Sequence, residues 1–240
     1  MDYDAFFEYV KLSSIPLRKL DNNSMPIGLA SGCLIDYKKR RILLTVQHAT
    51  GDMGKWAAEI KYEHGKGTLL YPLVSMNFFG SFSINNPRVK DIDFSFVTVP
   101  NTFTSYFQEI KPNGKILSEI PRNICQLSFD SEPDSTKLYG FSGQVLPDLV
   151  SNQLITKHRV YMGLKYIGTD NDYYIFELPI SHPGHEHFKG CSGSPIIDNK
   201  GNTIALVCGG ESNTNRIFGI SIKKYQVAID ITCGDLARDT

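Results

Sequence analysis

The sequence lacks an excess of either charge and any long hydrophobic run. Among its 240 residues, 25 Lys and Arg balance 25 Asp and Glu, so the formal net charge is zero. This balance argues against a broad electrostatic surface for nucleic acid or for an anionic membrane. No stretch approaches the roughly 18 apolar residues that a membrane-spanning helix needs. We therefore expect neither nucleic acid nor a membrane among the partners.

Cysteine is scarce, and its spacing suggests no pairing. There are five cysteines, an odd number, and none forms a CxxC motif, so a disulfide framework is not expected. The chain begins MDYDAFFEYV, with acidic residues where a secretory signal has basic ones, and no long apolar stretch follows. These features predict a reducing, cytoplasmic setting. A hydrophobic content of 41% with 21% charged residues excludes disorder and predicts a globular chain.

The hydrophobic pattern changes from helical to strand-like along the chain. Tyr3, Phe6, Phe7 and Val10 follow helical spacing, and Asp2 or Asp4 is available as the N-cap, so a short N-terminal helix is expected. From about residue 25 onward, short β-rich runs alternate with turns, as in a barrel or sandwich. The expected strands are residues 29–35, 42–46, 56–62, 94–99, 137–141, 159–167, 173–178, 203–208 and 217–222.

Two further segments interrupt or end this strand pattern. Residues 100–123 mix prolines with a helical turn at residues 105–110, so they are expected to connect two halves. Residues 223–231 are expected to close the chain as a helix.

The sharpest chemical motif is residues 190–195, GCSGSP. Ser192 lies between glycines, which let a substrate carbonyl approach the backbone closely. The amides of Gly190 and Ser192 would then converge on one oxyanion. The alternative is a tight turn between two strands with no chemical role.

A serine nucleophile needs a base and a group that orients the base. His48 follows the apolar run 42–46, and Asp93 precedes the alternating run 94–99. Each has a structural alternative, since a histidine in this position is often a core residue and an aspartate here often caps a strand. The order His48, Asp93, Ser192 is nevertheless one of the known chain orders of a Ser-His-Asp triad, with separations of 45 and 99 residues.

These motifs together resemble the trypsin/chymotrypsin-like serine endopeptidases, and are closest to the HtrA-type bacterial branch. The match covers residues 31–35 (SGCLI), 43–49 (LLTVQHA), 93–97 (DFSFV) and 190–195. It extends over most of residues 27–222, with the nucleophile motif as its most specific part. The resemblance implies an all-β fold of two six-stranded antiparallel barrels with short terminal helices. Residues 1–115 would carry His48 and Asp93, and residues 116–240 would carry Ser192 and the specificity pocket.

The resemblance also implies roles for other positions. Gly190 and Ser192 would form the oxyanion hole, Cys208, Gly209 and Gly210 would pair with the substrate backbone, and Gly219 would lie on the far wall of the pocket. Glu186 falls near the pocket base, where an acid selects Arg or Lys. A shift of one residue would instead place an imidazole there and favour acidic side chains.

One departure from the secreted members concerns activation. Cys191 stands where those members carry the aspartate that captures a new amino terminus, so activation by that route is not expected. Cys191 is expected to be a buried thiol and not the attacking group.

Three rival interpretations remain open at this stage. Ser142, in the sequence GFSG, resembles a hydrolase nucleophile elbow, but Gln144 replaces its last glycine and no alternating helices surround it. His182, His185 and His187 could bind a metal, although no HExxH motif accompanies them. A protease fold can also serve as a catalytically silent binding module.

The sequence thus predicts a serine endopeptidase that needs no cofactor and no metal. Its expected partner is a polypeptide substrate. Because a cytoplasmic protease needs restraint, we expect narrow specificity for a dedicated protein target, in a setting such as bacterial defence or signalling. The protein is expected either to be active as made or to be gated by an activating partner or a loop rearrangement.

Overall fold

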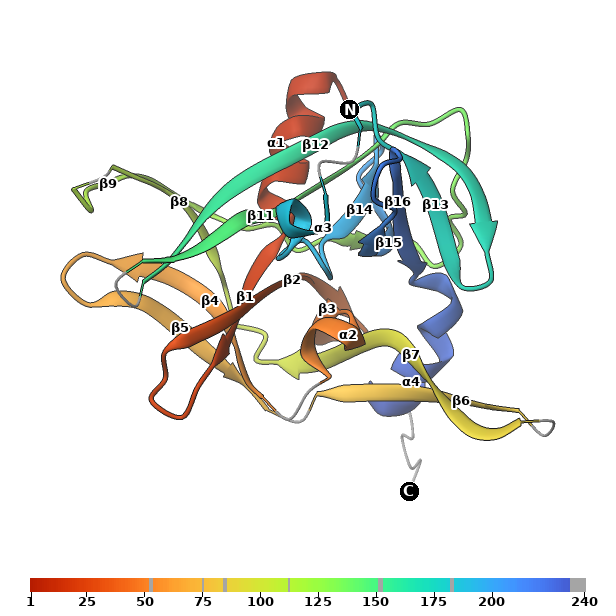
Figure 1. Cartoon of the computed structure of the whole chain (residues 1–240), viewed down its shortest axis with the longest axis horizontal. Helices are drawn as coiled ribbons and strands as arrows, with labels where there is room; N and C mark the ends of the chain where they lie inside the picture. The colour runs from red at the N-terminus through yellow and green to blue at the C-terminus, as the bar shows by residue number, and fades with distance from the viewer. Residues whose placement is uncertain are drawn as a thin grey trace.

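A computed structural model describes residues 1–51, 54–74, 76–83, 86–111, 113–150, 153–181 and 184–233. Within these ranges, two large antiparallel sheets lie one above the other, and short helices occupy the ends of the chain and the space between the sheets (Figure 1). The expectation of an all-β protein with short terminal helices is confirmed.

The N-terminal sheet contains seven strands in the order β5-β4-β1-β2-β3-β7-β6. Its strands are β1 (Ile15–Leu20), β2 (Pro26–Tyr37), β3 (Arg40–Thr45), β4 (Lys55–Glu63), β5 (Gly67–Leu73), β6 (Asn77–Ser83) and β7 (Asn86–Val99). Within the described residues, the end strands β5 and β6 are not paired with each other. The N-terminal half therefore differs from the expected six-stranded barrel in strand number and in closure.

The C-terminal sheet closes on itself as a barrel. Its six antiparallel strands are β11 (Tyr139–Val150), β12 (Gln153–Asp170), β13 (Tyr173–Glu177), β14 (Pro195–Asp198), β15 (Asn202–Gly210) and β16 (Arg216–Ser221). Closure follows because β15 pairs with both β14 and β16. The short β10 (Gln126–Leu127) adds to β15 in parallel. This half matches the barrel that the sequence predicts.

Each terminal helix packs against the sheet of the opposite half (Figure 1). The N-terminal helix α1 (Tyr3–Ser13) buries Phe6 and Val10 against Ile197 of β14, and the Asp2 carboxylate caps it by accepting from the Ala5 amide at 2.8 Å. The C-terminal segment comprises η1 (Lys223–Tyr225) and α4 (Gln226–Cys233), and the Tyr225 ring lies 4.9 Å from that of Phe94 in β7. Both predicted helices are confirmed. None of the helices described is long and apolar enough to cross a bilayer.

The expected helical turn at residues 105–110 is wrong. This segment is strand β8 (Tyr106–Ile110), which pairs with β9 (Ile116–Pro121) as a hairpin outside the two large sheets. The Asn113-Gly114 pair is a hairpin turn signal, and Gly114 has φ +78°. The predicted domain division after residue 115 falls inside this hairpin, and it stays a prediction.

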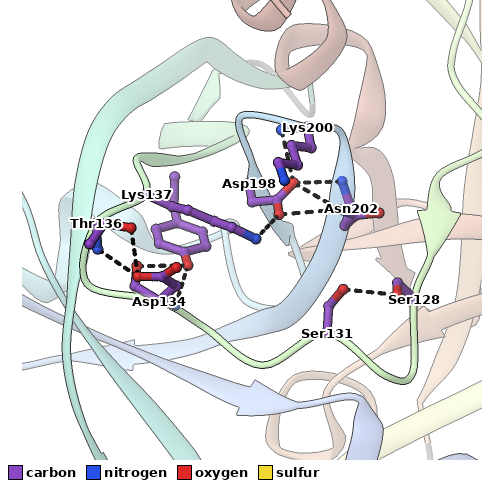
Figure 2. A network of polar contacts seen from close by, with 9 residues as sticks. Ser128, Ser131, Asp134, Thr136, Lys137, Asp198, Lys200 and Asn202 are labelled. Atoms are coloured by element: carbon purple, nitrogen blue, oxygen red, sulfur yellow. Dashed lines mark hydrogen bonds and ion pairs between the residues drawn. The ribbon is translucent and has the colours of Figure 1, made fainter.

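A buried carboxylate, Asp198, links the segment that precedes β11 to the turn between β14 and β15. Figure 2 shows Asp198, whose side chain is fully buried, accepting from the Lys137 ammonium at 2.9 Å and from the Asn202 amide at 2.9 Å. Burial alone would raise the pKa of Asp198, but these donors hold it below its ordinary value. The charged network therefore fixes the turn after β14, the strand that begins at the last residue of the GCSGSP motif.

Polar residues are also buried where α1 meets the C-terminal barrel. Burial, followed by the nearby Arg122 charge, lowers the pKa of His158 to about 3, against a hydrogen bond to the Lys11 backbone that favours the protonated ring. Between about pH 3 and about pH 6.5, His158 is therefore neutral in the folded protein while the unfolded chain binds a proton there.

Stability is therefore expected to fall as the pH decreases below about 6.5, where unfolded His158 becomes protonated. Relative to pH 7, the contribution lost at pH 5 is about 2 kcal/mol for a folded pKa near 3. Urea unfolding of the wild type and of His158→Gln at both pH values measures it. From pH 7 to pH 5, the wild type should lose about 2 kcal/mol more of its free energy of unfolding than His158→Gln does. Equal losses in the two proteins would contradict the assignment.

Candidate active site

His48 lies on a single helical turn that directly follows β3. This turn, α2 (Gln47–Thr50), is anchored by Thr50, which is buried and whose hydroxyl donates to the Val46 carbonyl at 3.0 Å. The same hydroxyl lies 3.1 Å from that of Ser95 in β7. Because Ser95 is two residues beyond Asp93, this contact fixes the helical turn against the strand that carries the carboxylate.

Asp93 holds the imidazole of His48 in one orientation. Its Oδ1 accepts from the His48 amide at 2.9 Å, and both of its oxygens lie 2.8 Å from His48 Nδ1. An ionised carboxylate only accepts hydrogen bonds, so we assign the proton to Nδ1. This leaves His48 Nε2 as an acceptor.

Ser192 completes the constellation from the other half of the chain. Its Oγ lies 3.0 Å from His48 Nε2, within hydrogen-bond distance. The His48 side chain is 43% exposed, whereas that of Asp93 is 16% exposed, so the imidazole reaches solvent and the carboxylate is shielded behind it. A hydroxyl bonded to a neutral imidazole that a carboxylate orients is the arrangement that activates serine as a nucleophile. The structure thus brings together all three residues that the sequence singled out.

The loop around Ser192 is held by the backbone of β2. Ser31 donates from its amide to the Ser192 carbonyl at 2.8 Å and from its hydroxyl to the Gly190 carbonyl at 2.6 Å. Gly190 has φ +118°, a conformation that favours glycine. Within the described part of the chain, the Gly190 and Ser192 amides donate no hydrogen bond. Both donors are therefore available to a bound oxygen.

Gly193 lies at a point of close approach between the two halves. It has φ +89°, and a Cβ placed there would lie 2.0 Å from the Ser31 carbonyl oxygen and 2.4 Å from Thr45 Oγ1. Its amide donates to the Val207 carbonyl of β15 at 2.7 Å. Gly193 thus joins the nucleophile loop to both sheets, and a side chain would force them apart. Ser31 and Thr45 both lie in matched motifs, but nothing local in the sequence marks their contact with this loop.

Free thiols surround the site but are not poised to attack. Cys191 is fully buried, and burial raises its pKa well above the ordinary value, as predicted for a non-attacking thiol. Burial, followed by the Asp93 charge, also raises the pKa of Cys208. The same two causes raise the pKa of Tyr173 to about 12, so both groups stay neutral beside the carboxylate at pH 7. Tyr173 is a neighbour of the site that sequence reasoning missed.

The residues predicted to bind substrate lie on the paired strands β15 and β16. Cys208 donates from its thiol to the Phe218 carbonyl at 3.2 Å, and Gly209 and Gly210 follow it at the end of β15. A Cβ at Gly209 would meet no atom within 4 Å, so the space over it is open. At Gly219, a Cβ would lie 2.7 Å from Ile196, which indicates close packing inside the barrel. Their roles in substrate binding stay predictions.

The residues around the predicted pocket base are only partly described. Glu186 lies on the short helix α3 (His185–Phe188), but the side chains of Glu186 and His185 lie outside the described part, as does the whole of His182. His187 Nε2 lies 2.6 Å from the Tyr161 hydroxyl. Among the described residues, no group of three His, Cys, Asp or Glu side chains is placed to hold a metal ion.

Ser142 has a structural position and not a catalytic one. It lies in β11, the first strand of the closed barrel, and is 1% exposed. Its hydroxyl donates to the Val10 carbonyl at the end of α1, at 2.7 Å. Ser142 therefore anchors the N-terminal helix to the barrel.

Comparison with known proteins supports the fold through structure alone. No family model and no curated protein sequence matches the chain. Among solved structures, a serine endoprotease from Yersinia pestis matches with a TM-score of 0.59 and 11% identity over 95% of this chain. The chain spans 65% of the length of that protein.

Two mammalian structures match over nearly their whole length. Neuropsin, a serine protease expressed in the limbic system of mouse brain, has a TM-score of 0.61 and 11% identity, covering 94% of this chain and 96% of its own. Human heparin binding protein has a TM-score of 0.56 and 9% identity, covering 93% and 92%. The chain therefore has the chymotrypsin-like fold of trypsin-like serine proteases, as its sequence motifs predict.

Proposed function

We propose that this protein is a serine endopeptidase that acts through a Ser192-His48-Asp93 triad. The observation that carries the proposal is the continuous chain of hydrogen-bond contacts from Asp93 through His48 to Ser192 Oγ. It occurs on a fold found in the serine proteases compared above. The amides of Gly190 and Ser192, which donate to no described residue, add a place for the negative charge that peptide hydrolysis develops.

The mechanism follows from the geometry. Ser192 Oγ attacks the scissile carbonyl while His48 Nε2 accepts its proton, and Asp93 keeps the Nδ1 proton in place and stabilises the imidazolium. The amides of Gly190 and Ser192 donate to the tetrahedral oxyanion. His48 then protonates the leaving amine, and water bound in its place hydrolyses the acyl-enzyme with His48 again acting as base.

We further propose narrow specificity for a dedicated protein target, in a cytoplasmic setting such as bacterial defence or signalling, with any gating of activity by a partner or a loop rearrangement. Support comes from Cys191, a fully buried neutral thiol at the position where secreted relatives carry the activating aspartate. Purified protein should therefore leave casein largely intact. Broad digestion of casein without a partner would contradict this restraint.

A peptide library tests the activity and the pocket together. Wild-type protein is expected to cleave a small subset of peptides, with Arg or Lys before the cleaved bond if Glu186 lies at the pocket base, and Ser192→Ala should cleave none. Preference for acidic side chains would move the pocket role from Glu186 to a neighbouring histidine. Equal cleavage by the wild type and Ser192→Ala would refute the proposed function.

A protein-binding module is the second candidate. One structural neighbour, human heparin binding protein, is named for binding, so the same fold is found in a protein with a binding function. This alternative predicts that the Ser192 hydroxyl has no enhanced reactivity, whereas the triad predicts that it has.

A further inference from the structure

A polar cavity of about 540 Å³ lies apart from the triad, where strands of both sheets and the β8–β9 hairpin meet. Arg18 of β1 and Glu59 of β4 line it from the N-terminal half, and Gln144 of β11 and His158 of β12 line it from the C-terminal barrel. Arg122, in the connection that follows β9, completes it. His48, Asp93 and Ser192 are not among its lining residues.

Four buried polar atoms in this lining have no partner among the described residues. They are Arg18 Nη1, Arg122 Nε, Gln144 Oε1 and His158 Nε2. Arg18, Arg122 and Gln144 are 9%, 7% and 8% exposed, so more than nine-tenths of each is buried. Buried polar atoms are almost always hydrogen-bonded, because an unmade bond is costly. Four such atoms from four separate segments therefore converge on one cavity as hydrogen-bonding groups that a ligand could use.

The cavity carries an excess of positive charge. Glu59 Oε2 accepts from Arg18 Nε at 3.1 Å and from Arg18 Nη2 at 2.7 Å, which pairs one guanidinium. Arg122 instead donates from Nη1 to the neutral Ser14 carbonyl at 2.6 Å and lies 5.4 Å from the centre of the Phe107 ring. Burial lowers the pKa of Arg122 to about 10, so it keeps its charge at pH 7. One carboxylate thus faces two guanidiniums.

His158 presents a hydrogen-bond acceptor to the cavity, in contrast to the arginines, which present donors. Its Nε2 is the unpartnered nitrogen, so the hydrogen bond to the Lys11 backbone uses Nδ1. Because that bond favours the protonated ring, it runs from Nδ1–H to the carbonyl, and Nε2 is left as an acceptor. With a pKa of about 3, the ring stays neutral near pH 7. A ligand must therefore present anionic oxygens to the arginines and a hydroxyl to His158.

We propose that this cavity binds a small anion that also carries hydroxyl groups, of the sugar-phosphate or hydroxycarboxylate class. Arginine matches both phosphate and carboxylate, because its planar fork donates to two oxygens at once. The volume lies within the range of small-molecule sites in proteins. Gln144 adds an amide that can accept from a ligand hydroxyl.

The site is close to the nucleophile loop without being part of it. The Gln144 carbonyl accepts from the Cys191 thiol at 3.7 Å. Ser14, which accepts from Arg122, has its hydroxyl 3.4 Å from that of Ser194. A bound anion would thus touch Gln144, which contacts Cys191 directly, and Arg122, which is linked to Ser194 through Ser14. Anion binding requires no catalysis, so the proposal of an anion site can be tested separately from the proposed endopeptidase function.

Isothermal titration calorimetry on the full chain, at constant ionic strength and pH 7, tests the site. Ribose 5-phosphate or gluconate should bind saturably with one site per chain, which separates a phosphate from a carboxylate ligand. Ribose, which has the hydroxyls without the charge, should bind at least 10-fold more weakly than the better anion. Absence of saturable binding by both anions, or equal binding of ribose, would overturn the proposal.

Variants locate the binding. Arg18→Gln and Arg122→Gln should each weaken the better anion on the order of 10- to 100-fold, the usual effect of losing a charged hydrogen bond. Arg216→Gln, which removes an exposed arginine of β16, is the matched control and should bind as the wild type does. Equal affinity in all three variants would place the anion elsewhere.

A second measurement avoids any variant that fails to fold. In the wild-type protein, the NMR signals of the His158 ring should shift as the better anion is added, and should saturate at the same ligand concentration as the calorimetric signal. Unshifted His158 signals at saturation would overturn the assignment of the cavity. The same titration on Ser192→Ala should give the same affinity, because the triad does not line the cavity.

Discussion

Replacing Ser192 by alanine is expected to lower turnover of a cleaved peptide on the order of 10⁴-fold or more while leaving the fold intact. Among the described residues, the Ser192 hydroxyl makes a hydrogen-bond contact to one side chain, 3.0 Å from His48 Nε2, whereas the backbone of the loop is held through Ser31 and Val207. Removing the hydroxyl therefore removes the nucleophile without releasing the loop. Rates of peptide cleavage, with circular dichroism as a check on folding, measure the effect.

His48→Ala should cause a loss of similar size, and the double variant should lose little more than either single variant. The reason is that the two residues act as one unit, so that the second removal takes away nothing that still operates. His64→Ala, in the exposed β4–β5 turn, and Ser131→Ala, in the loop of Figure 2, are matched controls and should retain full activity. Additive losses in the double variant would show that His48 and Ser192 do not form a triad.

Replacing Gly193 by alanine is expected to have the largest effect on stability, a loss of about 3 kcal/mol or more in the free energy of unfolding. Two penalties combine there. The residue has φ +89°, which a side chain disfavours, and the new Cβ would lie 2.0 Å from the Ser31 carbonyl oxygen. Neither the Ser31 backbone nor the tethered loop can move aside, because the Ser31 amide is bonded to the Ser192 carbonyl.

Gly168→Ala is the matched control for this change. Gly168 lies in β12, and a Cβ there would meet no atom within 4 Å, so its substitution should alter stability by no more than about 0.5 kcal/mol. Urea unfolding followed by fluorescence compares the two variants. If Gly193→Ala were as stable as Gly168→Ala, the close joint between the two halves would be refuted.

The parts of the site that sequence reasoning found are those encoded by local motifs. His48, Asp93 and Ser192 each follow or precede an apolar strand pattern, and their order along the chain matched a known triad order. The glycines at 190 and 193 also have a local signature, because the turn itself requires positive φ at both. The long-range contacts that hold this loop, such as the Ser31 hydroxyl on the Gly190 carbonyl, have no such local signature.

The errors have equally specific causes. Residues 105–110 suggest a helical turn when taken alone, yet their conformation is set by pairing with β9 across the Asn113-Gly114 turn. In the N-terminal sheet, β5 and β6 at the two ends are not paired with each other within the described residues. Hydrophobic periodicity predicts strands but does not predict which of them pair. The anion cavity joins Arg18, Arg122 and His158, residues more than 30 positions apart, so only the fold brings them together.

The structure shows the state of four of the five cysteines. Cys33, Cys125, Cys191 and Cys208 are free thiols. The first three are buried, and burial raises the pKa of Cys191 and of Cys208. The thiols near the site therefore act as small apolar groups that pack around the nucleophile loop. Because these four cysteines form no disulfide, packing and hydrogen bonds join the two halves in this region.

Covalent labelling by a fluorophosphonate probe tests the central claim most directly, because only a serine activated by a base reacts readily with it. Mass spectrometry of the intact protein should show one adduct, mapped to Ser192, on the wild type. Ser192→Ala and His48→Ala should remain unlabelled, while Ser131→Ala should label as the wild type does. If the wild type stayed unlabelled under all conditions, with or without candidate partners, the triad would be inactive and the protein would be a binding module on a protease fold.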